Sequence, residues 1–187
     1  MSEPIGPGSF VAVVGPSGVG KDSVLGYARD RAAETVFVRR AITRPPGAGE
    51  DSHELTDAEF ADIQAAGGFA LAWRAHGLGY GLPISLDDVI RDGRTAVANV
   101  SRTVLTSLAE RYADFRLVRL SVSPEIRAAR LAARGRETEV DIATRIARPD
   151  PAPEVAVDLE IVNDGTIAEA GELLLNFLRG LRNAPIS

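Results

Sequence analysis

Residues 10–23, FVAVVGPSGVGKDS, decide the fold of this 187-residue chain. The run 10–14 is short, apolar and rich in valine, which indicates a strand buried on both faces of a parallel sheet. A glycine ends this run, and apolar residues at helical spacing begin at Val24. The stretch therefore predicts a strand, a glycine-rich loop and a helix in direct succession.

The loop 15–21, GPSGVGK, has the G-x-x-x-x-G-K spacing of a loop that binds nucleotide phosphates. Glycines let backbone N–H groups turn toward phosphate oxygens, and the helix N-terminus adds a partial positive charge. We expect Lys21 to bridge the β and γ phosphates and to offset charge during transfer. A glycine-rich turn with an exposed lysine is the alternative. The expected nucleotide-binding residues are Gly15, Pro16, Ser17, Gly18, Val19, Gly20, Lys21, Asp22 and Ser23.

Lys21 is the only lysine among 21 basic residues. A bias toward arginine explains why other lysines are absent, but it does not explain where the one lysine lies. Lysine offers a compact point charge for this loop, whereas the planar fork of arginine is bulkier. The count therefore supports a functional phosphate loop.

Asp22 follows the lysine, where such loops usually carry a serine or threonine that binds Mg²⁺. A carboxylate beside a triphosphate repels it unless a cation lies between them. We expect Asp22 to hold Mg²⁺ directly or through water, with Ser23 as the alternative ligand. The other interpretation is that Asp22 only stabilises the positive end of the helix dipole.

The composition describes an ordinary globular domain, with 45% hydrophobic residues and a net charge of −5. The chain has no cysteine, which excludes disulfides, cysteine-based metal sites and a thiol nucleophile. The acidic balance argues against broad nucleic-acid binding. We expect a cytoplasmic monomer or homodimer with no membrane contact, because the chain shows neither a signal peptide nor an apolar stretch of about 20 residues.

Strands and helices alternate along the rest of the chain. Strands are predicted at 10–14, 36–38, 95–100, 115–122 and 159–162, and helices at 24–33, 101–111, 124–133, 140–147 and 166–181. This alternation predicts one α/β domain over 1–187, with a central parallel sheet of about five strands and helices on both faces. Asn99 and Arg102 follow a predicted strand at the edge where such sheets bind ligands, so either is a candidate for contact with the acceptor.

Residues 39–92 interrupt the alternation, and we interpret them as an insertion over the sheet. A loop at 44–50 precedes a helix that starts at Thr56, with Glu59 completing a capping box. A glycine-rich stretch at 77–81 and a short helix at 86–92 follow. Phe69 and Trp73 are expected to anchor the core of this insertion.

Four further segments resemble guanylate kinases, in the same order along the chain. They are ITRPPGAGEDSH at 42–53, GFALAWRAHGLGYG at 68–81, RGRETE at 134–139 with Ile142 and Arg145, and Asn163-Asp164. The resemblance implies a P-loop NTPase fold of the nucleoside monophosphate kinase type, with an acceptor-binding insertion over 39–92 and a mobile lid over about 133–147. It also implies that Arg134 and Arg145 close over the transferring phosphoryl group, Arg134 also contacting the nucleotide, and that Asn163 lies near the adenine pocket.

Several departures from guanylate kinases fall on residues that read guanine or bind phosphate. Arg40 stands where guanylate kinases have a serine that helps to read guanine, and Ala72 stands where they have a glutamate that pairs with the base. Other phosphate-binding residues are replaced by Gly47, Ser52 and Gly79, while Arg44 and Tyr80 remain. The substitutions remove the means of choosing guanine and add a cation suited to phosphate.

This combination resembles the ribose 1,5-bisphosphate phosphokinases of phosphonate catabolism, which carry the motifs found here at 15–23 (GPSGVGKDS), 42–44 (ITR) and 135–137 (GRE). The resemblance implies conversion of ribose 1,5-bisphosphate and ATP into 5-phosphoribosyl 1-diphosphate and ADP, with Mg²⁺. The implied catalytic residues are Lys21, Arg44, Arg134 and Arg145. The expected acceptor-binding residues are Arg40, Arg44, Tyr80 and Asn99.

Two alternatives compete with this hypothesis. One is a nucleoside monophosphate kinase with altered base specificity, and the other is an inactive guanylate kinase-like binding module. The intact phosphate loop argues against the second. The acceptor phosphate is already anionic and needs no strong general base, so His53 and His76 are expected to be loop or packing residues.

Overall fold

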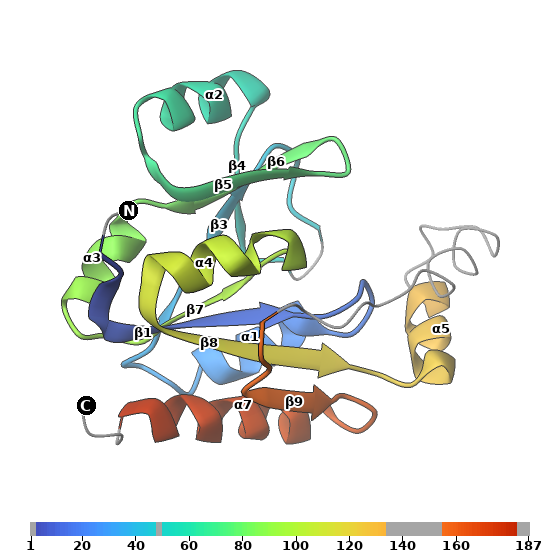
Figure 1. The fold of residues 1–187 in the computed structure, drawn as a ribbon. Coiled ribbons are helices and arrows are strands. Elements are labelled where there is room, and N and C mark those ends of the chain that lie inside the picture. Colours follow the sequence, from blue (N-terminus) through green and yellow to red (C-terminus); the bar gives the residue numbers. More distant parts are fainter. Residues whose placement is uncertain (1–2, 48–49, 134–154, 183–187) are drawn as a thin grey trace.

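The computed structural model of the chain describes residues 3–47, 50–133 and 155–182 and contains two sheets (Figure 1). The first sheet has the strand order β2-β7-β1-β8-β9, and its neighbouring strands all run parallel. Its strands are β1 (Ile5–Val14), β2 (Val36–Phe37), β7 (Ala96–Asn99), β8 (Tyr112–Ser121) and β9 (Leu159–Val162). The predicted five-stranded parallel sheet is therefore confirmed.

Helices cover both faces of the first sheet (Figure 1). The helices α3 (Ser85–Arg91) and α4 (Leu105–Arg111) lie on one face, where they pack against Phe10, Ala12 and Val14. The helices α1 (Lys21–Arg29) and α7 (Ile167–Arg182) pack on the other face, against Val11 and Val13. Both faces of β1 are thus buried, which explains its uninterrupted apolar run.

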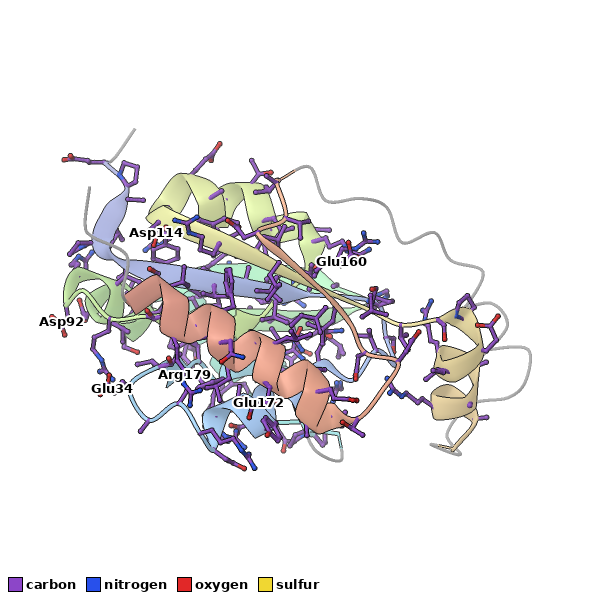
Figure 2. All side chains as sticks on the ribbon, turned by 90° about the horizontal axis from the view of Figure 1, so that it is seen from below. Glu34, Asp92, Asp114, Glu160, Glu172 and Arg179 are labelled. Carbon is purple, nitrogen blue, oxygen red and sulfur yellow. The ribbon has the colours of Figure 1, made fainter. Side chains whose placement is uncertain are left out.

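Figure 2 shows α7 crossing the sheet, with Glu172 and Arg179 along it. The hydroxyl of Tyr27 in α1 donates a hydrogen bond of 2.8 Å to the Glu172 carboxylate and so joins the two helices. Arg179 is exposed. Within the described ranges, neither α7 nor any other helix is long and apolar enough to cross a membrane.

The second sheet lies above the carboxyl ends of the first and is covered by α2 (Asp57–Ala65) (Figure 1). Its order is β4-β3-β6-β5, from β3 (Arg40–Ile42), β4 (Ser52–Glu54), β5 (Phe69–Ala75) and β6 (Leu78–Pro83). The capping box of Thr56 and Glu59 is present, as predicted. Phe69 packs on Phe60 with ring centroids 4.9 Å apart, so its anchoring role is confirmed.

The strands of the second sheet were not predicted, because glycine and proline in β6 disfavour a strand assignment. The structure explains why glycine is needed there. A Cβ on Gly81 would lie 2.5 Å from the Phe69 ring, and one on Gly79 would lie 3.1 Å from the Thr43 methyl group. The two glycines thus leave room for the Phe69 ring and the Thr43 side chain to pack closely against β6.

Several predicted boundaries were wrong, among them the start of β8, which begins at Tyr112 rather than at residue 115. β1 begins at Ile5 rather than at residue 10, because Gly8 lets the chain pass close to the backbone of Arg94, where a Cβ would lie 2.3 Å from the carbonyl oxygen. A short 3₁₀ helix, η1 (Arg102–Val104), precedes α4, so 101–111 is not one helix. α1 ends at Arg29 rather than at residue 33. The helix α5 (Pro124–Ala133) agrees with its prediction, and the helix predicted at 140–147 lies outside the described residues.

Candidate active site

A cavity of about 940 Å³ lies at the carboxyl ends of β1 and β7, between the first sheet and the second. On the donor side it is lined by Gly15, Ser17, Gly18, Gly20, Lys21 and Asp22. On the insertion side it is lined by Arg40, Arg44, Trp73 and Tyr80, with Asn99 between the two sides. The structure therefore brings together phosphate-loop and acceptor residues that are up to 84 positions apart in the sequence (Gly15 to Asn99).

The phosphate loop curls around the ammonium group of Lys21. Its Nζ donates hydrogen bonds of 2.7 Å to the Gly15 carbonyl and 3.2 Å to the Pro16 carbonyl. Gly18 and Gly20 have φ values of 87° and 91°, in the left-handed region that favours glycine. The ammonium group is thus held against the loop that is expected to receive the donor phosphates.

Asn163 lies beneath this loop rather than in the cavity. Its side chain is fully buried, and its Nδ2 donates a hydrogen bond of 2.8 Å to the Val19 carbonyl. Arg130 in α5 donates to the same carbonyl at 3.4 Å. The geometry gives Asn163 a supporting position under the loop, and direct contact with adenine stays a prediction.

Replacing Gly20 with alanine is expected to destabilise the loop. An alanine there needs a strained φ, and its Cβ would lie 2.7 Å from Asn163 Nδ2. We expect a loss of about 1–3 kcal/mol in the free energy of unfolding, and weaker ATP binding by calorimetry.

The matched control is Gly26→Ala in α1, where a Cβ meets nothing within 4 Å. That change is expected to stabilise the helix by about 0.5–1 kcal/mol. A Gly20→Ala protein as stable as the wild type would contradict this account of the loop.

Asp22 meets the requirements of a magnesium ligand better than Ser23 does. Asp22 lines the cavity, and its carboxylate accepts a hydrogen bond of 3.2 Å from Asn99 Nδ2. Ser23 is exposed and is not part of the lining. The described residues contain no group of three or more acidic or histidine side chains that could hold a metal. Mg²⁺ in nucleotide sites needs only one or two carboxylates, with phosphates and water completing its shell, so Asp22 fits this ion.

Glu50 joins the two arginines of the insertion, and the sequence reasoning missed it. Its carboxylate pairs with Arg40 at 2.8 Å and Arg44 at 2.9 Å, and it accepts a hydrogen bond from the Gly47 N–H. Burial pushes the pKa of Glu50 up, but the hydrogen bonds from Gly47, Arg44 and Arg40 outweigh it and hold the pKa below its ordinary value. The feature of the sequence that could have identified Glu50 is its position within the segment 42–53, which resembles guanylate kinases.

Two aromatic rings complete the insertion side of the cavity. Tyr80 stacks on Trp73 with centroids 5.4 Å apart and an angle of 11° between ring planes. The guanidinium of Arg40 lies 5.4 Å from the Tyr80 centroid and donates a hydrogen bond of 3.4 Å to the Asn99 carbonyl. Trp73 packs against the main core and also lines the cavity, so it is not only the anchor predicted.

Two departures from the guanylate kinase pattern have a structural reason. Ala72 packs against the apolar cluster of Ala41, Leu55 and Phe60 and does not line the cavity. Gly79 lies against the Phe60 ring, where a Cβ would come within 3.2 Å. Neither position offers a polar group to a base or a phosphate.

Two histidines and two arginines remain among the residues that the sequence analysis singled out. His76 lies at the β5–β6 turn with φ 53° and lines the cavity, whereas His53 is exposed in β4 outside it. Arg134 and Arg145 lie outside the described residues, and their roles stay predictions.

The cavity has a positive charge in a chain whose net charge is −5. Among the described residues, the cationic side chains in its lining are Lys21, Arg40, Arg44 and Arg102. The acidic ones are Asp22 and Glu50. An excess of two positive charges in a concave site favours a ligand with several negative charges.

Solved structures with the same fold include a guanylate kinase from Anaplasma phagocytophilum. It matches with a TM-score of 0.69 at 20% identity, over 100% of this chain and 91% of that one. A gluconokinase from Sinorhizobium meliloti matches with a TM-score of 0.51 at 22% identity, over 96% and 95% of the two chains. At these identities the likeness shows the fold alone.

Curated relatives are much more similar in sequence. A ribose 1,5-bisphosphate phosphokinase PhnN from Pseudofrankia inefficax is 52% identical over 188 residues, covering 100% of this chain and 99% of the relative. A protein of the same name from Chelativorans sp. is 47% identical over 182 residues, covering 94% and 87%. No model of a known protein family matches the chain. Because the identity is high and extends over nearly the full length, the chain belongs to the ribose 1,5-bisphosphate phosphokinase family.

Proposed function

We propose that the protein transfers the γ-phosphoryl group of ATP to ribose 1,5-bisphosphate, giving 5-phosphoribosyl 1-diphosphate and ADP. The observation that carries this proposal is the cavity itself. A phosphate loop forms one side, a pair of arginines held by Glu50 forms the other, and no base-reading carboxylate stands at Ala72. A substrate with a phosphate at each end suits such a positive site. Since phosphorylated substrates do not cross membranes unaided, we also propose that the protein acts in the cytoplasm.

The reaction requires alignment and charge neutralisation more than proton transfer. An oxygen of the 1-phosphate attacks the γ-phosphorus, and the bond from that phosphorus to the β–γ bridging oxygen breaks. The electron pair leaves with ADP. The attacking oxygen is already anionic, so no general base is needed, and the protein's task is to hold two polyanions in line.

The donor side depends on Lys21 and the loop amides. Lys21 Nζ donates hydrogen bonds to the Gly15 and Pro16 carbonyls. We propose that these bonds are exchanged for β- and γ-phosphate oxygens when ATP binds. Asp22 would hold Mg²⁺, which when bound neutralises charge on the β and γ oxygens. Asn99 keeps the Asp22 carboxylate oriented through its amide.

The acceptor side depends on Arg40, Arg44 and Tyr80. Glu50 holds both guanidinium groups in fixed positions, so that less side-chain entropy is lost when phosphate binds. Arginine forks bind phosphate through two parallel hydrogen bonds. We propose that Arg134 and Arg145 close over the phosphoryl group in transfer and shield it from water.

Replacing Asp22 with asparagine is expected to raise the Mg²⁺ concentration for half-maximal activity by roughly 10-fold, because an amide is a weaker ligand than a carboxylate. The expected kcat at saturating Mg²⁺ is lower as well. Ser23→Ala is the matched control and is expected to leave the Mg²⁺ dependence unchanged, since Ser23 is exposed outside the cavity. An unchanged Mg²⁺ titration for Asp22→Asn would rule out the metal role.

The product identifies the reaction. Incubation of the protein with ATP, Mg²⁺ and ribose 1,5-bisphosphate, followed by ³¹P NMR, is expected to show the coupled signals of a sugar diphosphate growing as ADP appears. Appearance of inorganic phosphate alone would show ATP hydrolysis and would contradict the proposal.

A further inference from the structure

We propose that Glu50 is a positioning residue of the acceptor side, which aligns the guanidinium groups of Arg40 and Arg44 for transfer and, in doing so, weakens the binding of anions to them. This inference rests on the proposed function and goes beyond it, because it separates the effect of Glu50 on turnover from its effect on affinity. Glu50 lines the cavity, and its side chain is only 9% exposed. It acts through the two arginines and through its own charge.

The Glu50 carboxylate gives one oxygen to each arginine. Its Oε1 accepts a hydrogen bond of 2.8 Å from Arg40 Nη2, and its Oε2 accepts one of 2.9 Å from Arg44 Nη2. The Gly47 N–H donates to Oε2 at 3.0 Å and so fixes the carboxylate to the backbone of the loop. Because a guanidinium carries five N–H donors, each arginine can bind a ligand while one of its nitrogens stays on Glu50.

The two arginines depend on Glu50 to different extents. Arg40 is 16% exposed, donates a hydrogen bond of 3.4 Å to the Asn99 carbonyl and lies 5.4 Å from the centroid of the Tyr80 ring. Arg44 is 37% exposed and donates a hydrogen bond of 2.7 Å to the carbonyl of its neighbour Pro45. Contacts with other segments thus hold Arg40 as well as Glu50 does, so Glu50 matters most for the position of Arg44.

The charge of Glu50 acts against the binding of anions. Burial raises the pKa of Glu50, but the hydrogen bonds from Gly47, Arg44 and Arg40 hold it below its ordinary value, so the carboxylate is ionised at neutral pH. Two positive charges and one negative charge leave the group with a net charge of +1. A phosphate at the arginine pair is therefore attracted by the arginines and repelled by the carboxylate between them.

These two effects predict opposite changes when the charge of Glu50 is removed. Turnover falls because Arg44 loses its alignment, whereas affinity for phosphate rises because the repulsion is gone. Only Arg44 gains freedom, so the entropy of ordering that one side chain offsets the gain in affinity only in part. If Glu50 merely held the loop together, its loss would weaken binding and turnover alike.

The test measures kcat with ribose 1,5-bisphosphate and, separately, the affinity for inorganic phosphate by calorimetry. A non-hydrolysable ATP analogue with Mg²⁺ occupies the donor loop during calorimetry, so that the probe reports on the acceptor side. We expect Glu50→Gln to bind phosphate about 5-fold more tightly than the wild type. Its kcat is expected to be about 10-fold lower, because an amide cannot accept from both arginines and Gly47 as the carboxylate does.

Glu50→Asp separates alignment from charge and covers the case in which Glu50→Gln does not fold, which its melting temperature reports. Aspartate keeps the negative charge, but it is shorter by one methylene group and cannot reach both arginines as glutamate does. We expect kcat to fall by about 10-fold, while the affinity for phosphate stays within about twofold of the wild type.

The matched control is Asp51→Asn, at the residue next to Glu50. Asp51 also pairs with two arginines, Arg39 at 2.6 Å and Arg29 of α1, but its side chain is 41% exposed and does not line the cavity of about 940 Å³. We expect both kcat and the affinity for phosphate to stay within about twofold of the wild type.

Two results would overturn the inference. One is phosphate binding that is unchanged or weaker in Glu50→Gln, and the other is a kcat of Glu50→Asp equal to that of Asp51→Asn. If the wild type does not phosphorylate ribose 1,5-bisphosphate, while Glu50→Gln still binds inorganic phosphate more tightly, the proposed function fails and the effect of Glu50 on anion affinity stands.

Discussion

Lys21→Met is expected to lower kcat by about 1,000-fold, equivalent to about 4 kcal/mol of transition-state stabilisation. The ammonium group is the cation of the phosphate loop, and methionine keeps the length of the side chain while removing its charge. The variant loses the hydrogen bonds from Lys21 Nζ to the Gly15 and Pro16 carbonyls. Its free energy of unfolding should therefore stay within about 1–2 kcal/mol of the wild type. Steady-state kinetics and urea unfolding measure the two quantities.

Two controls make this result specific. Lys21→Arg keeps the charge but places a bulkier planar group in a tight loop, so we expect it to recover only a small part of the activity. Chemical modification of the wild type adds a test, because Lys21 and the N-terminus are the only primary amines. ATP is expected to protect activity against a lysine reagent. More than about a tenth of wild-type kcat in Lys21→Met would move the donor site away from this loop.

Asp87→Ala is expected to reduce the free energy of unfolding by about 3 kcal/mol, the lower end of the range for breaking a buried ion pair. Asp87 lies in α3 and is only 2% exposed. It accepts a hydrogen bond of 3.0 Å from Arg111 Nε, a second one from Arg111 Nη2, and one of 2.9 Å from the Tyr112 hydroxyl. Burial raises the pKa of Tyr112, and the Asp87 charge raises it further. The lower end applies because the Arg111 side chain is 32% exposed and keeps some solvent.

The neighbouring residue provides the control for that measurement. Asp88 pairs with Arg91 at 2.8 Å, but its side chain is 74% exposed, so Asp88→Ala should change stability very little. Urea unfolding at pH 7 compares the two variants. Asp87→Ala should keep its KM values below its unfolding temperature, because Asp87 is not part of the cavity lining. A loss below about 1 kcal/mol would show that the carboxylate does not hold this corner of the core together.

The parts of the fold that could be predicted from the sequence are those whose pattern follows from burial. The apolar run 10–14 is buried on both faces, and that simple pattern identified the central strand. β6 could not be predicted because contacts with other segments, and not a local preference, require its glycines: Gly81 lies against the Phe69 ring and Gly79 against the Phe60 ring. β1 was predicted too short because the glycine at position 8 is required by close contact with the backbone of Arg94, which is distant in the sequence. Contacts between distant segments leave no periodic signal.

The residues of the candidate site show the same difference between local pattern and distant contacts. The loop residues could be assigned because spacing in one segment fixes their geometry. Glu50 was missed because its role depends on Arg40 and Arg44 converging on one carboxylate across a folded strand and loop. Asn163 was expected near adenine from resemblance, whereas its burial beneath Val19 appears only when β9 is in place. Which charged side chains pair with one another depends on how distant segments meet in the fold.

The choice of acceptor tests the central claim most directly. With ATP and Mg²⁺ at saturation, kcat/KM is measured for ribose 1,5-bisphosphate and for GMP. The positive cavity and the apolar setting of Ala72 predict efficient turnover of ribose 1,5-bisphosphate, with GMP used at least about 1,000-fold less well because position 72 offers no carboxylate to pair with its base. Turnover of GMP at an equal or higher kcat/KM, with ribose 1,5-bisphosphate inert, would contradict it.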